Sequence, residues 1–140
     1  MKYINKSFLV EKVKAENLAK KFGTPIYCYS YEKLKKNIIN FKKNFKSFNP
    51  LICFAVKSNT NVSLLKEVNN LGCGADVVSI GELMKALKAG IDSKKIVFSG
   101  VGKTSQEISY AIEKKILLIN AESKSEIIEI EKIAKFKKKI

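Results

Sequence analysis

The chain has 140 residues, 46% of them hydrophobic, and carries 27 Lys+Arg against 13 Asp+Glu, which gives a formal net charge of +14. A chain of this length can bury a hydrophobic core, no segment approaches the ~20 apolar residues of a membrane span, and the first residues lack the apolar core of a secretory leader. We therefore expect a cytoplasmic globular protein without a membrane partner.

The residue types that are missing narrow the chemistry further. The chain has no histidine, so it cannot by itself supply a Ser-His triad or a His-based metal site. The three cysteines, Cys28, Cys53 and Cys73, are too widely spaced for a zinc motif or a disulfide framework. Every basic residue is lysine, and the lysines are spread over all helical segments, which indicates a solvated surface rather than a nucleic-acid site. A non-enzymatic lysine-rich module that binds polyanions is an alternative.

The first 50 residues are expected to contain a helix, a short strand and a second helix. Apolar residues at helical spacing predict a helix over residues 7–22, which Gly23-Thr24-Pro25 ends. β-Branched and aromatic residues predict a strand over residues 25–30. A second helix follows over residues 31–47, and Asn49-Pro50 ends it.

From residue 51 onward, strands and helices alternate regularly. The predicted elements, beginning with a strand, are 51–57, 61–71, 75–78, 81–89, 96–99, 105–114, 116–120 and 124–135. Three of the helices begin with a capping box, in which a hydroxyl and a carboxylate bond exposed amides reciprocally: Ser79 with Glu82, Thr104 with Glu107, and Ser123 with Glu126. Four βα units with short connections imply parallel strands, either in an open doubly wound sheet or in part of a (β/α)8 barrel.

Polar residues stand where the predicted strands end, which is where parallel α/β folds gather their functional groups. Lys57 is the leading catalytic candidate, because a lysine amine with little water around it loses its proton readily and becomes a nucleophile. The alternative is a lysine that simply meets solvent at a strand end. The rim residues are Lys57, Ser58, Asn59, Ser79, Ser99, Gly100 and Asn120.

The neighbourhood of Lys57 is predicted to have room for a flat ligand. With a period of two, the small residues Cys53 and Ala55 lie on the same strand face as Lys57. Asp76, inside the next strand, either pairs with the Lys57 amine or with a ligand, or stays in water near the strand start. Glu82 is explained equally well as a helix cap.

Several stretches of the sequence carry a family resemblance. The segment Phe54–Asn59 resembles the cofactor-attachment motif of the pyridoxal-phosphate decarboxylases that act on diaminopimelate, ornithine and arginine. The resemblance continues through Gly72–Leu83, Ile96–Lys103 and Leu117–Ser123, while Phe22–Tyr27 is similar to the diaminopimelate branch. Together these stretches are far more specific than any one alone.

The resemblance implies a pyridoxal-phosphate-binding (β/α)8 TIM barrel followed by a β-rich domain, in a homodimeric enzyme without a nucleic-acid or membrane partner. Lys57 would hold pyridoxal 5′-phosphate as a Schiff base, and Asp76 and Glu82 match family positions near the cofactor and the lysine. An amino-acid substrate would displace Lys57 and lose carbon dioxide, with the cofactor ring as electron sink. The implied reaction converts meso-diaminopimelate to L-lysine, and an ornithine- or arginine-type decarboxylation is the alternative.

The chain departs from the family pattern in what it lacks. It has no histidine to stack on the cofactor ring. Nothing in it matches the glycine-rich phosphate loop, the carboxylate on the ring nitrogen, the substrate-binding arginines, or the cysteine and acidic residue that complete the site across a dimer. We therefore expect residues 1–140 to form a partial barrel domain, with residues 1–50 ahead of four βα units in residues 51–140. The C-terminal half of the barrel and the β-rich domain would be absent, and the fragment alone would be inactive.

Overall fold

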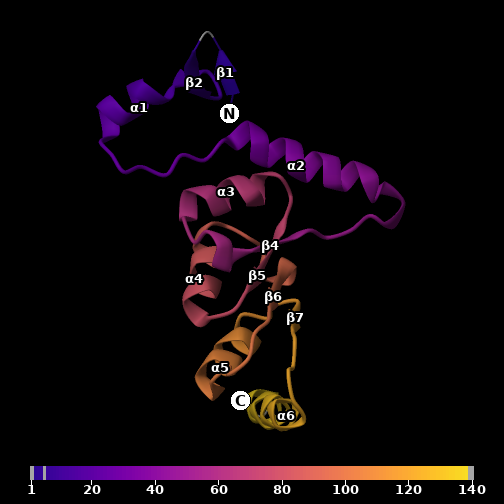
Figure 1. Ribbon diagram of the computed structural model, residues 1–140. Helices are drawn as coiled ribbons and strands as arrows, with labels where there is room; N and C mark the ends of the chain where they lie inside the picture. The colour runs from indigo at the N-terminus through magenta and orange to yellow at the C-terminus, as the bar shows by residue number, and fades with distance from the viewer. Residues whose placement is uncertain (1, 5, 139–140) are drawn as a thin grey trace. The chain divides into compact units, whose positions relative to one another are not determined.

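The computed structural model of the chain describes residues 2–4 and 6–138. It divides into two compact units, Met1–Pro50 and Leu51–Ile140 (Figure 1). None of the described helices is long and apolar enough to cross a bilayer.

The N-terminal unit combines a small antiparallel sheet with two helices. The strand order is β1-β2-β3, and Val10 of β2 lies opposite Val13 of β3. The elements are β1 (Lys2–Ile4), β2 (Ser7–Val10), β3 (Val13–Lys14), α1 (Ala15–Phe22), α2 (Tyr31–Asn44) and the 3-10 turn η1 (Lys46–Phe48).

Two of the three elements predicted for this unit need correction. Residues 7–14 form strands instead of the first half of a helix, and Glu11, with a φ of 57°, lies in the tight turn between them. Apolar residues in this stretch fit a helical face and a hairpin equally well, and pairing across the turn decides between the two. Residues 25–30 lie outside any strand of the described chain, so the strand predicted there is wrong. The helix α2 is confirmed, and its N-cap Ser30 accepts a hydrogen bond from the Lys33 amide at 3.1 Å.

The C-terminal unit is a parallel four-stranded sheet with the order β4-β5-β6-β7, and a helix follows each strand. The predicted alternation is therefore confirmed, with element ends shifted by a few residues. The elements are β4 (Cys53–Ala55), η2 (Val56–Ser58), α3 (Val62–Asn70), β5 (Gly74–Val77), α4 (Ile80–Lys88), η3 (Ser93–Lys95), β6 (Ile96–Phe98), α5 (Ser105–Glu113), β7 (Leu118–Ile119) and α6 (Lys124–Lys138).

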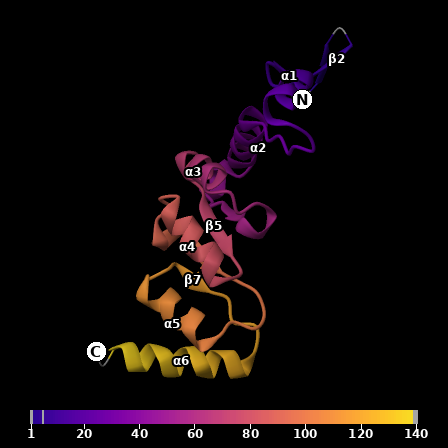
Figure 2. The ribbon, with the colours of Figure 1, turned by 90° about the vertical axis from the view of Figure 1, so that its left-hand side faces the viewer.

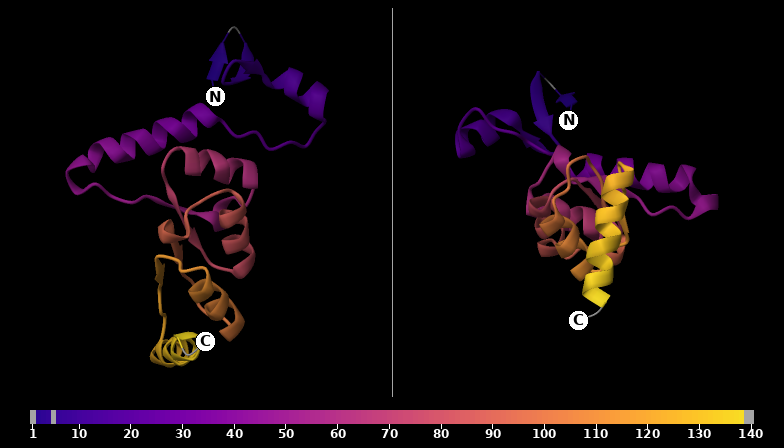
Figure 3. Two further views of the ribbon diagram at one scale, coloured as in Figure 1. Left: turned by 180° about the vertical axis from the view of Figure 1, so that it is seen from behind. Right: turned by 90° about the horizontal axis from the view of Figure 1, so that it is seen from below.

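The helices of this unit pack in chain order. Helix α3 contacts α4, α4 contacts α5, and α5 contacts α6. Figures 1 and 3 show α3, α4 and α5 in succession along one side of the sheet, and Figure 2 shows α6 running beside α5. This leaves the ends of the strands, where each chain segment turns into its helix, along one rim of the sheet.

The core of the C-terminal unit lies between the sheet and its helices. Val77 and Phe98 from the strands and Leu65 and Leu83 from the helices are fully buried. Burying a side chain of this size contributes about 1.5–3 kcal/mol. The same apolar runs that predict the strands therefore hold the layers together and fix where the rim residues emerge.

The three predicted capping boxes show two different hydrogen-bond patterns. At Thr104 both bonds are present, because Thr104 Oγ1 accepts from the Glu107 amide and the Glu107 carboxylate accepts from the Thr104 amide. At Ser79 and Ser123 the hydroxyl bond forms, but the carboxylates of Glu82 and Glu126 accept instead from the amide one residue before the cap. The helix starts are as predicted, and two of the carboxylates reach one residue further into the preceding loop.

Candidate active site

Lys57 lies on a 3-10 turn and not on the strand itself. The strand β4 ends at Ala55, and the turn η2 closes through a hydrogen bond from Ser58 Oγ to the Ala55 carbonyl at 2.7 Å. The fully buried Val56 anchors this turn in the core. Lys57 is exposed at its outer side, so the prediction that Lys57 shares a strand face with Cys53 and Ala55 is wrong.

The amine of Lys57 forms no ion pair within residues 2–4 and 6–138. The alternative in which Asp76 pairs with the Lys57 amine is therefore not seen in the described chain. The described residues also leave the Lys57 side chain exposed to solvent. What they supply is a primary amine at the end of β4 that is not held by another side chain.

Asp76 is linked by hydrogen bonds to residues that follow the next two strands. It lies in β5, beside Ala55 of β4 and Val97 of β6. Ser99 Oγ donates a 2.6 Å hydrogen bond to Asp76 Oδ1, and Asn120 Nδ2 donates to Ser99 Oγ at 2.9 Å. Neither sequence alternative for Asp76 describes this arrangement, since its partner is a hydroxyl on the neighbouring strand end.

Sequence reasoning named Asp76, Ser99 and Asn120 but did not connect them. The signal was present, because the three residues stand at or near corresponding places on consecutive parallel strands. The hydrogen bond from Ser99 orients the Asp76 carboxylate through Oδ1. The rim is thus a row of polar groups with a fixed carboxylate near its centre.

Glu82 is engaged as a helix cap. Its Oε2 accepts a hydrogen bond from the Val78 amide at 2.9 Å, and its own amide donates to Ser79 Oγ at 3.3 Å. The sequence left open whether Glu82 caps a helix or lies near a cofactor, and these hydrogen bonds show that it caps α4. The half-buried side chain fixes the loop between β5 and α4, next to the end of the strand that carries Asp76.

Lys103 is the buried charge that sequence reasoning missed. Its side chain is only 1% exposed, although composition alone indicates solvated lysines. Lys103 Nζ donates to the carbonyls of Gly100 and Asn120, both at 2.7 Å, and pairs with Glu126 Oε1 at 3.0 Å. The hydrogen bond from the Glu122 amide lowers the pKa of Glu126, and the Lys103 ammonium lowers it further.

Cys53 does not compete with Lys57 as a nucleophile. Burial raises the pKa of the Cys53 thiol, and the charges of Asp76 and Cys73 raise it further. Because the thiolate and not the thiol attacks electrophiles, Cys53 is held in its unreactive form. Its Sγ lies 3.8 Å from the carbonyl oxygen of Lys95.

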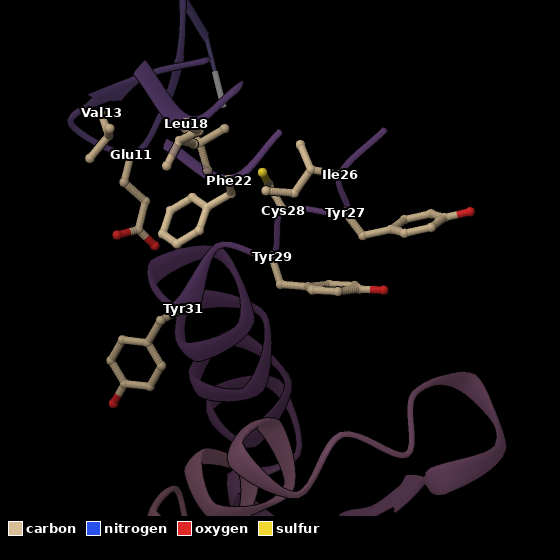
Figure 4. Close-up of a pocket in the computed structure, with 10 residues that line it drawn as sticks. Glu11, Val13, Leu18, Phe22, Ile26, Tyr27, Cys28, Tyr29 and Tyr31 are labelled. Carbon is tan, nitrogen blue, oxygen red and sulfur yellow. The ribbon is translucent and has the colours of Figure 1, made fainter. Parts of the chain in front are cut away.

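A hollow of about 400 Å³ opens in the N-terminal unit, lined mainly by apolar and aromatic side chains (Figure 4). The one carboxylate in it, Glu11, accepts hydrogen bonds from Ser30 Oγ at 2.8 Å and from the Glu32 amide at 2.9 Å. The hydrogen bond from the Glu32 amide contributes most to a lowered pKa of Glu11, and the one from Ser30 lowers it further. The hollow has no lysine in its lining, so the rim of the parallel sheet is the better candidate for amine chemistry.

A family model described as pyridoxal-dependent decarboxylase, pyridoxal binding domain, matches residues 31–140. The chain belongs to this family. The predicted family is thereby confirmed, and so is the cofactor class, since a pyridoxal-dependent decarboxylase carries pyridoxal phosphate.

Curated relatives of this decarboxylase family match most of the chain. Diaminopimelate decarboxylase from Helicobacter pylori strain J99 is 50% identical over 119 residues, which cover 85% of this chain and 29% of the relative. Diaminopimelate decarboxylase from Aquifex aeolicus is 43% identical over 134 residues, which cover 96% of this chain and 31% of the relative. The chain therefore spans less than a third of the length of these relatives.

Solved structures agree with the fold. A crystal structure of a protein from Aquifex aeolicus aligns with a TM-score of 0.93 at 42% identity, over 98% of this chain and 34% of that one. Diaminopimelate decarboxylase from Helicobacter pylori, solved with L-lysine, aligns with a TM-score of 0.84 at 46% identity, over 88% of this chain and 31% of that one. The predicted fold class, an α/β chain that forms part of a pyridoxal-phosphate-binding TIM barrel, is confirmed.

The rim residues fit a pyridoxal cofactor in the chemistry of their groups. An aldehyde condenses with a primary amine, and the exposed Lys57 amine is free of ion pairs within the described chain. One carboxylate, Asp76, is held beside the strand that leads to Lys57. The groups on the rim are therefore compatible with the cofactor class of this family.

Proposed function

We propose that this chain supplies the cofactor-holding lysine of a pyridoxal-phosphate-dependent decarboxylase that converts meso-diaminopimelate to L-lysine. The observation that carries the proposal is the exposed Lys57 amine at the end of β4, on the rim that also carries Asp76. Relatives named diaminopimelate decarboxylase at 43–50% identity support the substrate. The proposal includes a homodimeric, cytoplasmic complete protein and little or no turnover by the 140 residues alone.

Each rim residue has a defined task in this proposal. Lys57 Nζ would hold the cofactor through a covalent bond, and the Asp76 carboxylate, oriented by Ser99, would interact with the bound group. Glu82 holds the loop after β5 in place. When bound, the cofactor supplies an electron-accepting ring that stabilises the carbanion left as carbon dioxide departs. When not bonded to the cofactor, the Lys57 amine would be placed to move a proton at the substrate.

An ornithine- or arginine-type decarboxylase is the alternative within the family. The ornithine decarboxylase of Entamoeba histolytica aligns at 31% identity with a TM-score of 0.68. A viral arginine decarboxylase aligns at 22% identity, which supports only the shared fold. The diaminopimelate decarboxylase of Helicobacter pylori, at 46%, favours the diaminopimelate reaction over both.

The first test maps the cofactor bond in the complete gene product that carries this sequence. After loading with pyridoxal phosphate and reduction with borohydride, we expect peptide mass spectrometry to find the label on Lys57. Lys57→Ala should lose the label and lower carbon dioxide release from meso-diaminopimelate at least about a thousandfold, the scale expected when a covalent catalyst is removed. The matched control, Lys66→Ala, removes an exposed lysine of α3 and should change neither.

Two results would count against the proposal. A label on another lysine would remove Lys57 from the role. Faster carbon dioxide release from ornithine or arginine than from meso-diaminopimelate would leave the proposed cofactor chemistry standing but show that the proposed substrate is wrong.

A further inference from the structure

The most unusual charged group of the C-terminal unit is the buried ammonium of Lys103. Its side chain is 1% exposed and that of its partner Glu126 is 11% exposed. By contrast, the ion pair of Lys114 with Glu113 is 37% and 53% exposed. Removing an ammonium from water is costly unless its hydrogen bonds and charge are compensated. Lys103 meets this requirement with two carbonyls and one carboxylate.

The three acceptors of Lys103 come from three different segments. Gly100 follows β6, Asn120 follows β7, and Glu126 lies in the first turn of α6. A single ammonium therefore ties two strand ends and a helix start together. Two further hydrogen bonds connect the same segments: the Gly100 amide donates to Glu122 Oε1 at 3.2 Å, and the Glu122 amide donates to Glu126 Oε2.

These are the same strand ends that orient Asp76. The Asn120 carbonyl accepts a hydrogen bond from Lys103, and the Asn120 side-chain amide donates one to Ser99 Oγ. Ser99, which precedes Gly100, donates in turn to Asp76. Lys103 thus holds the backbone at Asn120 and next to Ser99, two members of the Asn120–Ser99–Asp76 chain of hydrogen bonds. Without it, the backbone at Gly100 and Asn120 would lose its common anchor.

We propose that Lys103 is a positioning residue, which holds the Asn120–Ser99–Asp76 chain so that Asp76 keeps one orientation towards bound pyridoxal phosphate. This inference rests on the proposed function, because it concerns the same rim. Lys103 touches neither cofactor nor substrate in this role. It acts on the carboxylate through two backbone carbonyls and two side-chain hydrogen bonds.

The test measures pyridoxal phosphate binding by the complete gene product. Lys103→Met keeps an unbranched side chain one atom shorter than lysine and removes the charge, and we expect it to weaken cofactor affinity about tenfold, the scale of coupling within one hydrogen-bond network. The absorbance band of the bound cofactor should also shift or change its pH dependence. Lys114→Met, which removes the lysine of an exposed ion pair, should change neither the affinity nor the band.

A second variant separates positioning from folding. Lys103→Met leaves the Glu126 carboxylate without its partner, whereas Lys103→Met combined with Glu126→Gln replaces the pair by neutral groups and is expected to fold. A cycle with Ser99→Ala then tests the route to Asp76. If Lys103 acts through Ser99, the Lys103→Met effect on affinity should shrink towards twofold in the Ser99→Ala background.

The outcomes are distinct. Wild-type protein that binds no pyridoxal phosphate would overturn the proposed function itself. Wild-type binding with unchanged affinity and spectrum in the folded double variant would overturn only the role of Lys103. An affinity loss of equal size with and without Ser99, or failure of both variants to fold, would assign Lys103 to general stability and overturn the positioning role.

Discussion

At the scale of single residues, Glu107 links two consecutive βα units. Its Oε2 accepts from the Thr104 amide at 3.0 Å, which caps α5, and its Oε1 accepts from the Ile80 amide at 3.0 Å, at the start of α4. The bond from the Thr104 amide, with those from Ile80 and the Thr104 hydroxyl, lowers the pKa of Glu107 below its ordinary value of 4.5. The carboxylate form therefore stabilises the folded state.

This lowered pKa predicts an acid-dependent loss of stability. A group whose pKa is lower in the folded state adds stability that is fully present above its unfolded value and is lost as the pH falls through its folded value. Glu107→Gln should therefore cost about 1 kcal/mol above pH ~5 and progressively less below it. Urea midpoints of the complete gene product across this range measure the effect. Glu16→Gln, at an exposed site, should change the midpoint little, and an equal effect of both variants would contradict the prediction.

The individual site residues could be predicted only in part. Lys57, Ser99 and Asn120 were singled out because they stand where predicted strands end, and Asp76 because it is a carboxylate inside a predicted strand. Their hydrogen bonds could not be found, because these depend on side-chain directions across neighbouring strands. The burial of Lys103 was missed because it depends on the distant Asn120 carbonyl and Glu126 carboxylate, and nothing in the local sequence distinguishes it from a solvated lysine.

At the scale of elements, Gly74 is fixed by a close approach between β5 and the turn before β6. A Cβ at Gly74 would overlap the carbonyl oxygen of Lys95. That oxygen belongs to the backbone, so it cannot rotate away as a flexible side chain would. A Cβ at Gly81, in the first turn of α4, would instead meet nothing nearer than Ser79 Oγ at 3.9 Å.

These two glycines should respond to alanine in opposite directions. We expect Gly74→Ala to destabilise the protein by about 1–3 kcal/mol, since overpacking forces backbone shifts. Gly81→Ala should stabilise it by up to about 1 kcal/mol, because alanine loses less backbone entropy in a helix. Thermal unfolding of the two variants beside the wild type measures both signs. Equal midpoints for the two variants would show that the β5–η3 contact is looser than described.

The elements that sequence patterns predicted well are those with local signals. Each helix of the C-terminal unit has a polar cap and an apolar face, so α3 to α6 needed no knowledge of distant residues. The hairpin of β2 and β3 was not predicted from local signals, because its apolar residues also fit a helix. Its pairing across the turn is decided by contacts that no short window contains.

At the scale of the whole molecule, the sheet has open edges within the described chain. Strands β4 and β7 are the outer strands of the four-stranded sheet. Near β7, Leu117 and Leu118 are 52% and 49% exposed, and Ile127 and Ile128 of α6 are 56% and 57% exposed. Unpaired strand edges beside exposed apolar side chains favour association with another chain. The net charge of +14 opposes that association through repulsion.

The balance of these two effects predicts salt-dependent self-association of residues 1–140 produced as a separate polypeptide. Salt shortens the reach of charge repulsion to about 8 Å at physiological ionic strength and leaves apolar contact intact. Sedimentation velocity should therefore find more associated species as salt rises. Leu118→Lys places a charge on the edge strand and should reduce association, whereas Tyr27→Lys, at a residue that is 89% exposed in the other unit, adds the same charge and should reduce it less. A monodisperse monomer at every salt concentration would mean that the edges of β4 and β7 are protected in solution.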